Sequence, residues 1–167
     1  STSTFNINGP TADVFSTGTL GVRVGSGGNG TLNINSGGSL RSQGAFTLAL
    51  QAGSQGATTV SGTSGAVRSE LVTLDPANGD MFIAQNGAGT MLVTLGGLVD
   101  VADDAFIAPT AGFSGSVTVA SSVATDSTFD TGGDLNIGCN LTAAAGGSGV
   151  LSVNDGGFVT IGGTTRI

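Results

Sequence analysis

The chain has 167 residues, of which 31 are glycine and only 9% are charged, and its four basic residues are all arginine. The formal net charge of −7 excludes a nucleic-acid partner, because phosphate recognition needs a basic face. Collagen is excluded because glycine does not recur at every third position. Intrinsic disorder is excluded because apolar residues make up 38% of the chain and fall at regular places.

The charges divide unevenly along the chain. Residues 1–69 hold three arginines and one acid, a net charge of +2, whereas residues 70–167 hold ten acids and one arginine, a net charge of −9. We interpret most of the acids as a solvated surface. No apolar run is long enough to span a membrane, so we expect no membrane insertion.

The first segment, STSTFNINGPTADVFSTG, alternates polar and apolar residues like a strand and then turns at a Gly-Pro pair. It is similar to VTVASSVATDSTFDTGG further along, which predicts that the chain opens partway through a coil. The matched pairs are Phe5 with Val117, Ile7 with Val119, and Phe15 with Phe129.

A short sequence motif is then repeated along the chain. GTLNINSGG, which starts at Gly30, returns as GTMLVTLGG at Gly89 and GVLSVNDGG at Gly149, and fainter copies start at Gly56 and Gly115. From Gly30 to Gly89 is 59 residues, and from Gly89 to Gly149 is 60. A fixed period with glycine at the corners predicts a solenoid.

We expect a single domain, residues 1–167, with coils at about 1–19 (partial), 20–45, 46–79, 80–104, 105–133 and 134–167. The coil at 20–45 should contain strands at 20–24, 31–34 and 39–41. The next should use FTLALQ, ATTV and AVRS, and LVTLDPANG should follow as a turn-rich insertion. A second insertion, CNLTAAAGGS, should project as a loop, so that deleting residues 140–145 leaves the fold intact.

Alternation within each strand predicts which side chains face inward, and stacked coils place like on like. The fold class is therefore all-β, a single-stranded parallel β-helix of five to six coils, and the glycine content argues against helices. Val22 and Val24 should align with Met81 and Ile83, and then with Leu135 and Ile137; Phe46 should align with Phe106. The predicted core columns are Leu32, Met91 and Leu151; Ile34, Val93 and Val153; and Leu40, Val99 and Val159.

GNGTLNINSGGSL, GAGTMLVTLGGLV and GSGVLSVNDGGFV carry a resemblance to a known family. Their pattern resembles the repeat of autotransporter passenger domains and PEP-CTERM-associated bacterial surface proteins. The resemblance implies a right-handed β-helix outside a bacterial cell or on its surface. Members of the family include adhesins, enzyme scaffolds and structural proteins, so the motif implies architecture more than activity.

Polysaccharide-cleaving β-helices need clustered acids with a basic residue. Two acidic sets occur here without nearby lysine or histidine, so we predict no enzyme and no catalytic residues. The sets are Asp100, Asp103 and Asp104, and Asp126, Asp130 and Asp134. Calcium at Asp103 and Asp104 is the one metal site and cofactor we consider. Cys139 is the single cysteine, which leaves open a free thiol or a bridge to another chain.

We expect an extracellular structural protein whose subunits stack head-to-tail into a bacterial surface filament or sheath. A start at Ser1 without Met favours export after removal of a leader. The alternatives are a fragment of a larger adhesin passenger and, more distantly, a glycan-active enzyme. The expected partners are further copies of the chain and a cell-surface glycan. The predicted assembly ends are Phe5, Ile7, Val159, Ile161 and Ile167.

Overall fold

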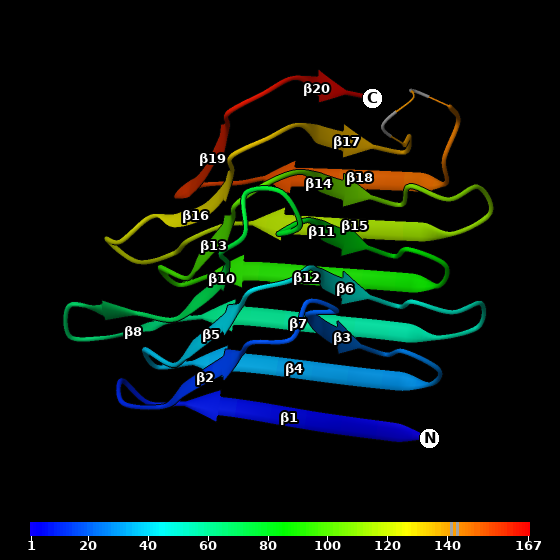
Figure 1. The fold of residues 1–167 in the computed structure, drawn as a ribbon. Coiled ribbons are helices and arrows are strands. Elements are labelled where there is room, and N and C mark those ends of the chain that lie inside the picture. The colour runs from blue at the N-terminus through cyan, green and yellow to red at the C-terminus, as the bar shows by residue number, and fades with distance from the viewer. Residues whose placement is uncertain (141, 143) are drawn as a thin grey trace.

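The computed structural model describes residues 1–140, 142 and 144–167. The described chain forms a parallel β-solenoid, as predicted, and its wall consists of three parallel sheets with six strands each. Figure 1 shows the coils stacked from the N-terminus at the bottom to the C-terminus at the top. The described residues include no helix long and apolar enough to cross a membrane.

Each coil contributes one strand to each sheet. Sheet A consists of β1 (Thr2–Asn8), β4 (Asn29–Asn35), β7 (Gln55–Ser61), β12 (Ala88–Thr94), β15 (Ser114–Val119) and β18 (Ser148–Val153). Sheet B consists of β2 (Asp13–Ser16), β5 (Ser39–Ser42), β10 (Glu70–Thr73), β13 (Leu98–Val101), β16 (Ser127–Thr131) and β19 (Gly157–Ile161). Sheet C consists of β3 (Val22–Val24), β6 (Phe46–Leu48), β11 (Met81–Ile83), β14 (Ala105–Ile107), β17 (Leu135–Ile137) and β20 (Thr165–Arg166).

The repeated glycine marks the corner at which the chain passes from sheet C to sheet A. The five leading glycines lie in register with one another and with Ser3. At Gly89 a Cβ would lie 2.5 Å from the backbone nitrogen of Ala84, which itself has a φ of 63°. The corner is therefore too tight for a larger residue, and this explains why the sequence repeats glycine there.

The predicted core columns are confirmed in register. Leu32 and Met91 lie in one column, Ile34 and Val93 in the next, and all four side chains are at most 2% exposed. The Leu40, Val99 and Val159 column and the alignment of Val22 and Val24 with later coils are confirmed as well. In the inner coils, each inward side chain thus packs between its equivalents one strand spacing above and below.

At the C-terminal end the prediction of a fully buried column is wrong. Val153 keeps its register with Val119, but its side chain is 49% exposed, and Leu151 is only partly buried. The reason is that β18 is the last strand of sheet A, so a neighbouring coil covers these side chains on one side only.

Two predicted aromatic alignments are wrong by one residue. Val14, not Phe15, lies in the inward column with Phe129, and Phe15 points outward, where the guanidinium carbon of Arg41 lies 5.6 Å from its ring centroid. A slip of one residue turns a side chain to the opposite face. Loops of unequal length between strands hid this slip from alignment by glycine spacing.

The second wrong alignment concerns Phe46, which lies in register with Met81 and Ala105 instead of with Phe106. Phe106 faces the outside of sheet C and stacks on Phe82, with 5.0 Å between ring centroids. Phe46 and Phe106 therefore lie on opposite faces of sheet C.

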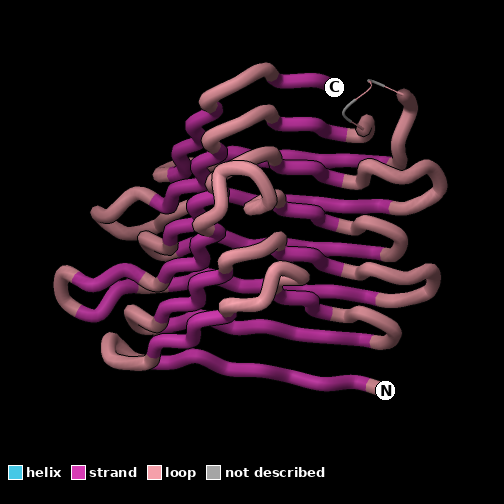
Figure 2. The backbone as a smooth tube through the Cα atoms, in the orientation of Figure 1, coloured by secondary structure: helices cyan, strands magenta, loops and turns pink. Residues whose placement is uncertain are grey.

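The prediction that AVRS is a strand of the solenoid wall is wrong. Residues Val67–Arg68 of this segment form β9, which pairs antiparallel with β8 (Thr63–Ser64) in a hairpin that projects from the stack (Figure 2). The wall strand is β10, from the segment expected to be an insertion. Arg68 fastens the hairpin, because its guanidinium donates to the Gly96 carbonyl at 2.7 Å and to Thr128 Oγ1 at 2.9 Å.

The CNLTAAAGGS segment links β17 to β18, and its residues 141 and 143 lie outside the described residues. The Asn140 amide donates to the Ala144 carbonyl at 3.2 Å. Cys139, at the start of the segment, is a free cysteine that is only 6% exposed.

Candidate cation site

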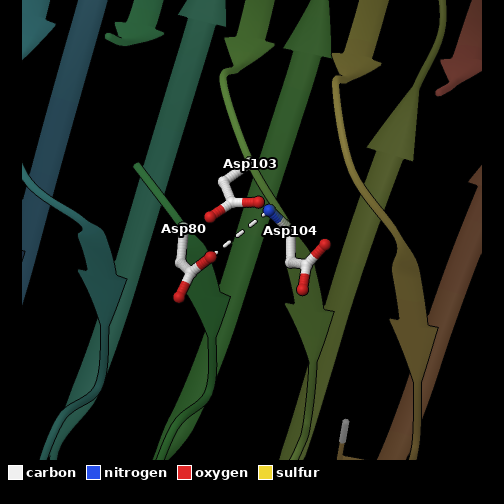
Figure 3. A group of neighbouring side chains, drawn as sticks. All are labelled: Asp80, Asp103 and Asp104. Atoms are coloured by element: carbon white, nitrogen blue, oxygen red, sulfur yellow. Dashed lines mark hydrogen bonds between the residues drawn. The ribbon is translucent and has the colours of Figure 1, made fainter. Parts of the chain in front are cut away.

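Three aspartates meet at the corner between sheets B and C. Asp80 directly precedes β11, and Asp103 and Asp104 directly precede β14 on the next coil. One carboxylate oxygen of each lies within 4.8 Å of those of the other two, and Figure 3 shows the three side chains as neighbours. The predicted pair Asp103 and Asp104 is thus joined by Asp80, which the sequence analysis missed.

Asp80 and Asp104 belong to a ladder of carboxylates that runs along the stack. The Asp104 amide donates to Asp80 Oδ1 at 3.3 Å (dashed in Figure 3). One coil further, the Asp134 amide donates to Asp104 Oδ1 at 2.6 Å, and the Thr164 amide donates to Asp134 Oδ1 at 2.6 Å. Each carboxylate therefore satisfies a backbone donor of the following coil.

Asp103 breaks the regularity of this ladder. Its equivalents on the next two coils are Gly133 and Gly163, where a Cβ would lie 2.2 and 2.3 Å from the carboxylate oxygen of the coil below. Because Asp103 has a Cβ at this place, the Asp80 carboxylate is held further from the next coil, which accounts for the longer hydrogen bond. Asp103, where the next two coils have glycine, also places a second carboxylate beside that of Asp80.

The cluster has an unfavourable electrostatic environment for three negative charges. Burial raises the pKa of Asp80 to about 6, and the neighbouring Asp103 and Asp104 carboxylates add to the rise. Burial, with Asp104 and Asp75, also raises the pKa of Asp103. At the end of the ladder the opposite holds, since the Thr164 amide and Arg166 lower the pKa of Asp134.

Three clustered carboxylates suit a hard cation, which would replace the repulsion between their charges by attraction. Ca²⁺ takes roughly six to eight oxygen ligands, so three aspartates supply part of a coordination sphere that water would complete. This partial fit is typical of a low-affinity surface site. Asp80 is equally able to hold a proton near its pKa of about 6.

The two groups of aspartates that are close in sequence do not form two clusters in the structure, where aspartates of different coils lie side by side instead. Asp100 lies in register with Asp130 on the outer face of sheet B, and Asp104 with Asp134 at the corner. Asp126 lies in the loop before β16, where its carbonyl accepts a hydrogen bond from Arg68 at 2.9 Å. Burial and the Asp130 charge raise the pKa of Asp100.

A signal for Asp80 was present in the sequence. The segments MFIA, AFIA and LNIG align, and an aspartate stands one residue before each of them, that is, before Met81, Ala105 and Leu135. Extending the aligned block by one residue would have revealed the ladder. No family model, curated protein or solved structure matches the chain.

Proposed function

We propose that this protein is an extracellular structural protein without enzymatic activity, whose solenoids stack head-to-tail into a filament or sheath on a bacterial surface. The observation that carries the proposal is the exposure of inward-facing apolar side chains on the first and last coils. The repeat resemblance to autotransporter passengers and PEP-CTERM-associated proteins supports the location.

The N-terminal end of the stack is an open apolar hollow. The Phe5 side chain faces the interior of the solenoid yet is 52% exposed. Beside it lies a cavity of about 280 Å³. Its apolar lining consists of Phe5, Val14, Val22, Val24, Leu32 and Leu40. Such a surface is stabilised when another coil covers it.

The C-terminal end is its counterpart. Val153 is 49% exposed and Ile167 is 95% exposed. Val159 and Ile161, predicted as end residues, are only partly buried against the core. At the opposite end, the predicted residue Ile7 is only 3% exposed, because its own chain already covers the side chain. Ile7 would therefore contact a second copy only through its backbone at the edge of β1.

The two ends match in register. Continuing the pairing beyond β18 would place β1 of a second copy on it, with Phe5 above Leu151 and Ile7 above Val153. Edge strands carry unpaired backbone donors and acceptors that such a contact would satisfy. A contact between different ends does not close on itself and therefore produces a fibre.

Charge supports the same orientation, with one exception. The first 69 residues carry +2 and the remainder −9, so unlike ends attract. On the outer face of sheet C, however, Arg166 would come next to Arg23 of the second copy. Arg166 is ion-paired with Asp134, which reduces the repulsion.

Mixing two blocked variants tests both polymerisation and polarity. The parent should sediment as polymers and form filaments in electron micrographs. Phe5→Asp blocks one end and Val153→Asp the other, so each alone should be monomeric and an equimolar mixture should form dimers. Val150→Asp is the matched control. Val150 also lies on β18 and is also 49% exposed, but its side chain faces outward from sheet A, whereas that of Val153 faces the interior of the solenoid.

A parent that stays monomeric at high concentration refutes the filament. The same apolar ends would then favour the second candidate, further coils of a longer adhesin passenger. Dimers of either blocked variant alone would indicate contacts between like ends and refute the head-to-tail arrangement. Cleavage of an acidic polysaccharide, lost on Asp100→Asn, would favour a glycan-active enzyme instead.

A further inference from the structure

The hairpin of β8 and β9 encloses a hollow on the outer face of sheet B. The coil below turns the corner from sheet A to sheet B with residues 36–38 alone, whereas this coil uses residues 62–69. Figure 2 shows the extra length projecting from the stack. The hollow has a volume of about 510 Å³ and lies between the hairpin, the turn that precedes β2 and the outward side chains of β5 and β10.

The hairpin is held firmly against the wall of the solenoid. Ser69 at its base is fully buried, and its hydroxyl donates to the last carbonyl of β7 at 2.7 Å and accepts from the Gly37 amide at 3.0 Å. Arg68 fastens the hairpin to the coils above. At Gly37 an added Cβ would lie 3.2 Å from Pro10 Cα and 3.2 Å from Val67 Cγ1, so the turn and the hairpin meet there. The hollow is therefore preformed, and a ligand would not have to order its walls.

Arg41 is held in one position on the floor of the hollow. Its Nε donates to Asp13 Oδ1 at 3.3 Å and its Nη2 donates to Asp13 Oδ2, a bidentate ion pair that fixes the plane of the guanidinium. The guanidinium also lies over the Phe15 ring. Among the described residues Nη1 makes no hydrogen bond, so Arg41 keeps donors for a ligand.

Glu70 supplies an acceptor beside this donor. The Ser39 hydroxyl donates to Glu70 Oε1 at 2.8 Å, whereas Oε2 has no hydrogen-bond partner in the part of the chain that the structure describes. Arg41 on β5 and Glu70 on β10 occupy neighbouring outward positions of adjacent strands, within reach of each other's long side chains. The hollow therefore offers a fixed donor and a free acceptor side by side.

This arrangement favours a neutral ligand with hydroxyl groups. The Arg41 guanidinium repels an ammonium, and the Asp13 and Glu70 carboxylates repel an anion. A hydroxyl both donates and accepts, so two neighbouring hydroxyls satisfy the donor and the acceptor together. Pro10 and Val67 add apolar surface to the lining, and Val67 is 45% exposed. A volume of about 510 Å³ lies within the range of roughly 300–1,000 Å³ that is usual for small-molecule sites.

A sugar ring combines these features, since it carries neighbouring hydroxyls on its rim and C–H groups on its faces. We propose that the hollow binds a neutral sugar unit of a polysaccharide. Two hydroxyls accept from Arg41 and donate to Glu70, while the C–H face of the ring packs on Pro10 and Val67. This function goes beyond the structural role proposed above and does not depend on it, because one chain carries the whole hollow.

Isothermal titration calorimetry of the 167-residue chain with neutral hexasaccharides of glucose, mannose and N-acetylglucosamine tests the proposal. The parent should bind at least one of them at millimolar concentration. Glu70→Ala removes the acceptor and should weaken binding about tenfold or more, as a lost hydrogen bond to a charged group does. Ala66→Trp, at the exposed tip of the hairpin, should weaken binding to a similar extent by filling the hollow. Asp100→Ala is the matched control, because Asp100 stands on the same face of sheet B outside the hollow.

Thermal melting of each variant separates loss of the site from loss of the fold. Absence of binding to all three sugars would overturn the proposal, as would equal binding by Glu70→Ala and Asp100→Ala. Tighter binding of a glucosamine oligomer than of its N-acetylated form would assign the hollow to ammonium groups and would overturn it as well. Sedimentation of the same samples keeps the two proposals apart, because monomers that bind sugar support the hollow alone. Polymers that Ala66→Trp dissociates would make the hollow an interface between copies, which also overturns the proposal.

Discussion

Val93→Asp should destabilise the solenoid strongly, because Val93 is fully buried between Val60 and Val119 of the neighbouring coils. Losing the valine removes about 1.5 kcal/mol or more of apolar burial, and an unpaired polar group in its place costs about 2 kcal/mol or more. The carboxyl would take up a proton at neutral pH instead of remaining charged. A total of about 4 kcal/mol lowers the melting temperature of a chain of this size by roughly 8–16 °C.

Leu92→Asp is the control for this experiment. Leu92 precedes Val93 on the same strand, but its side chain points outward and is 39% exposed. Its melting temperature should stay within a few degrees of the parent, and circular dichroism would follow both variants. Equal melting of the two variants would refute the assignment of inward and outward faces on which the whole fold description rests.

Three further predictions concern polar groups. The folded-state pKa of Asp80, about 6, lies above its ordinary value of 3.8, so the stability that its proton contributes is present below about pH 4 and is lost as the pH rises through 6. Asp80→Asn should remove this pH dependence of the unfolding free energy, which is on the order of 1 kcal/mol for a half-exposed group. Equal changes of melting temperature with pH in the parent and in the variant would contradict the assignment. Asp103→Gly introduces the residue that the next coil has at Gly133, and it should raise the melting temperature measured without calcium. It should also abolish any increase of the melting temperature in millimolar Ca²⁺, and an increase that persists in the variant would exclude the site. Thr58→Val should stabilise by about 1 kcal/mol in urea titrations, because among the described residues its buried hydroxyl has no hydrogen-bond partner, and a loss of stability would imply an undetected one.

The sequence by itself determined the architecture and the identity of the inward columns. The leading glycine of each copy marks a corner that excludes a Cβ, and strict alternation after it fixes the faces of Leu32 and Val93. Both signals are local, and stacking merely repeats them at each coil. For the same reason the register of sheet A was predictable over the whole chain, including Ser3 opposite the glycines.

Only the tertiary structure decided what depends on the corners between sheets and on the ends of the stack. Loops of unequal length set whether Val14 or Phe15 turns inward, and glycine spacing does not report that length. Asp80 and Asp104 meet because consecutive coils lie one strand spacing apart, although 24 residues of chain separate them. Val153 looks like Val93 in sequence, yet it is half exposed because burial in a solenoid requires a coil on both sides.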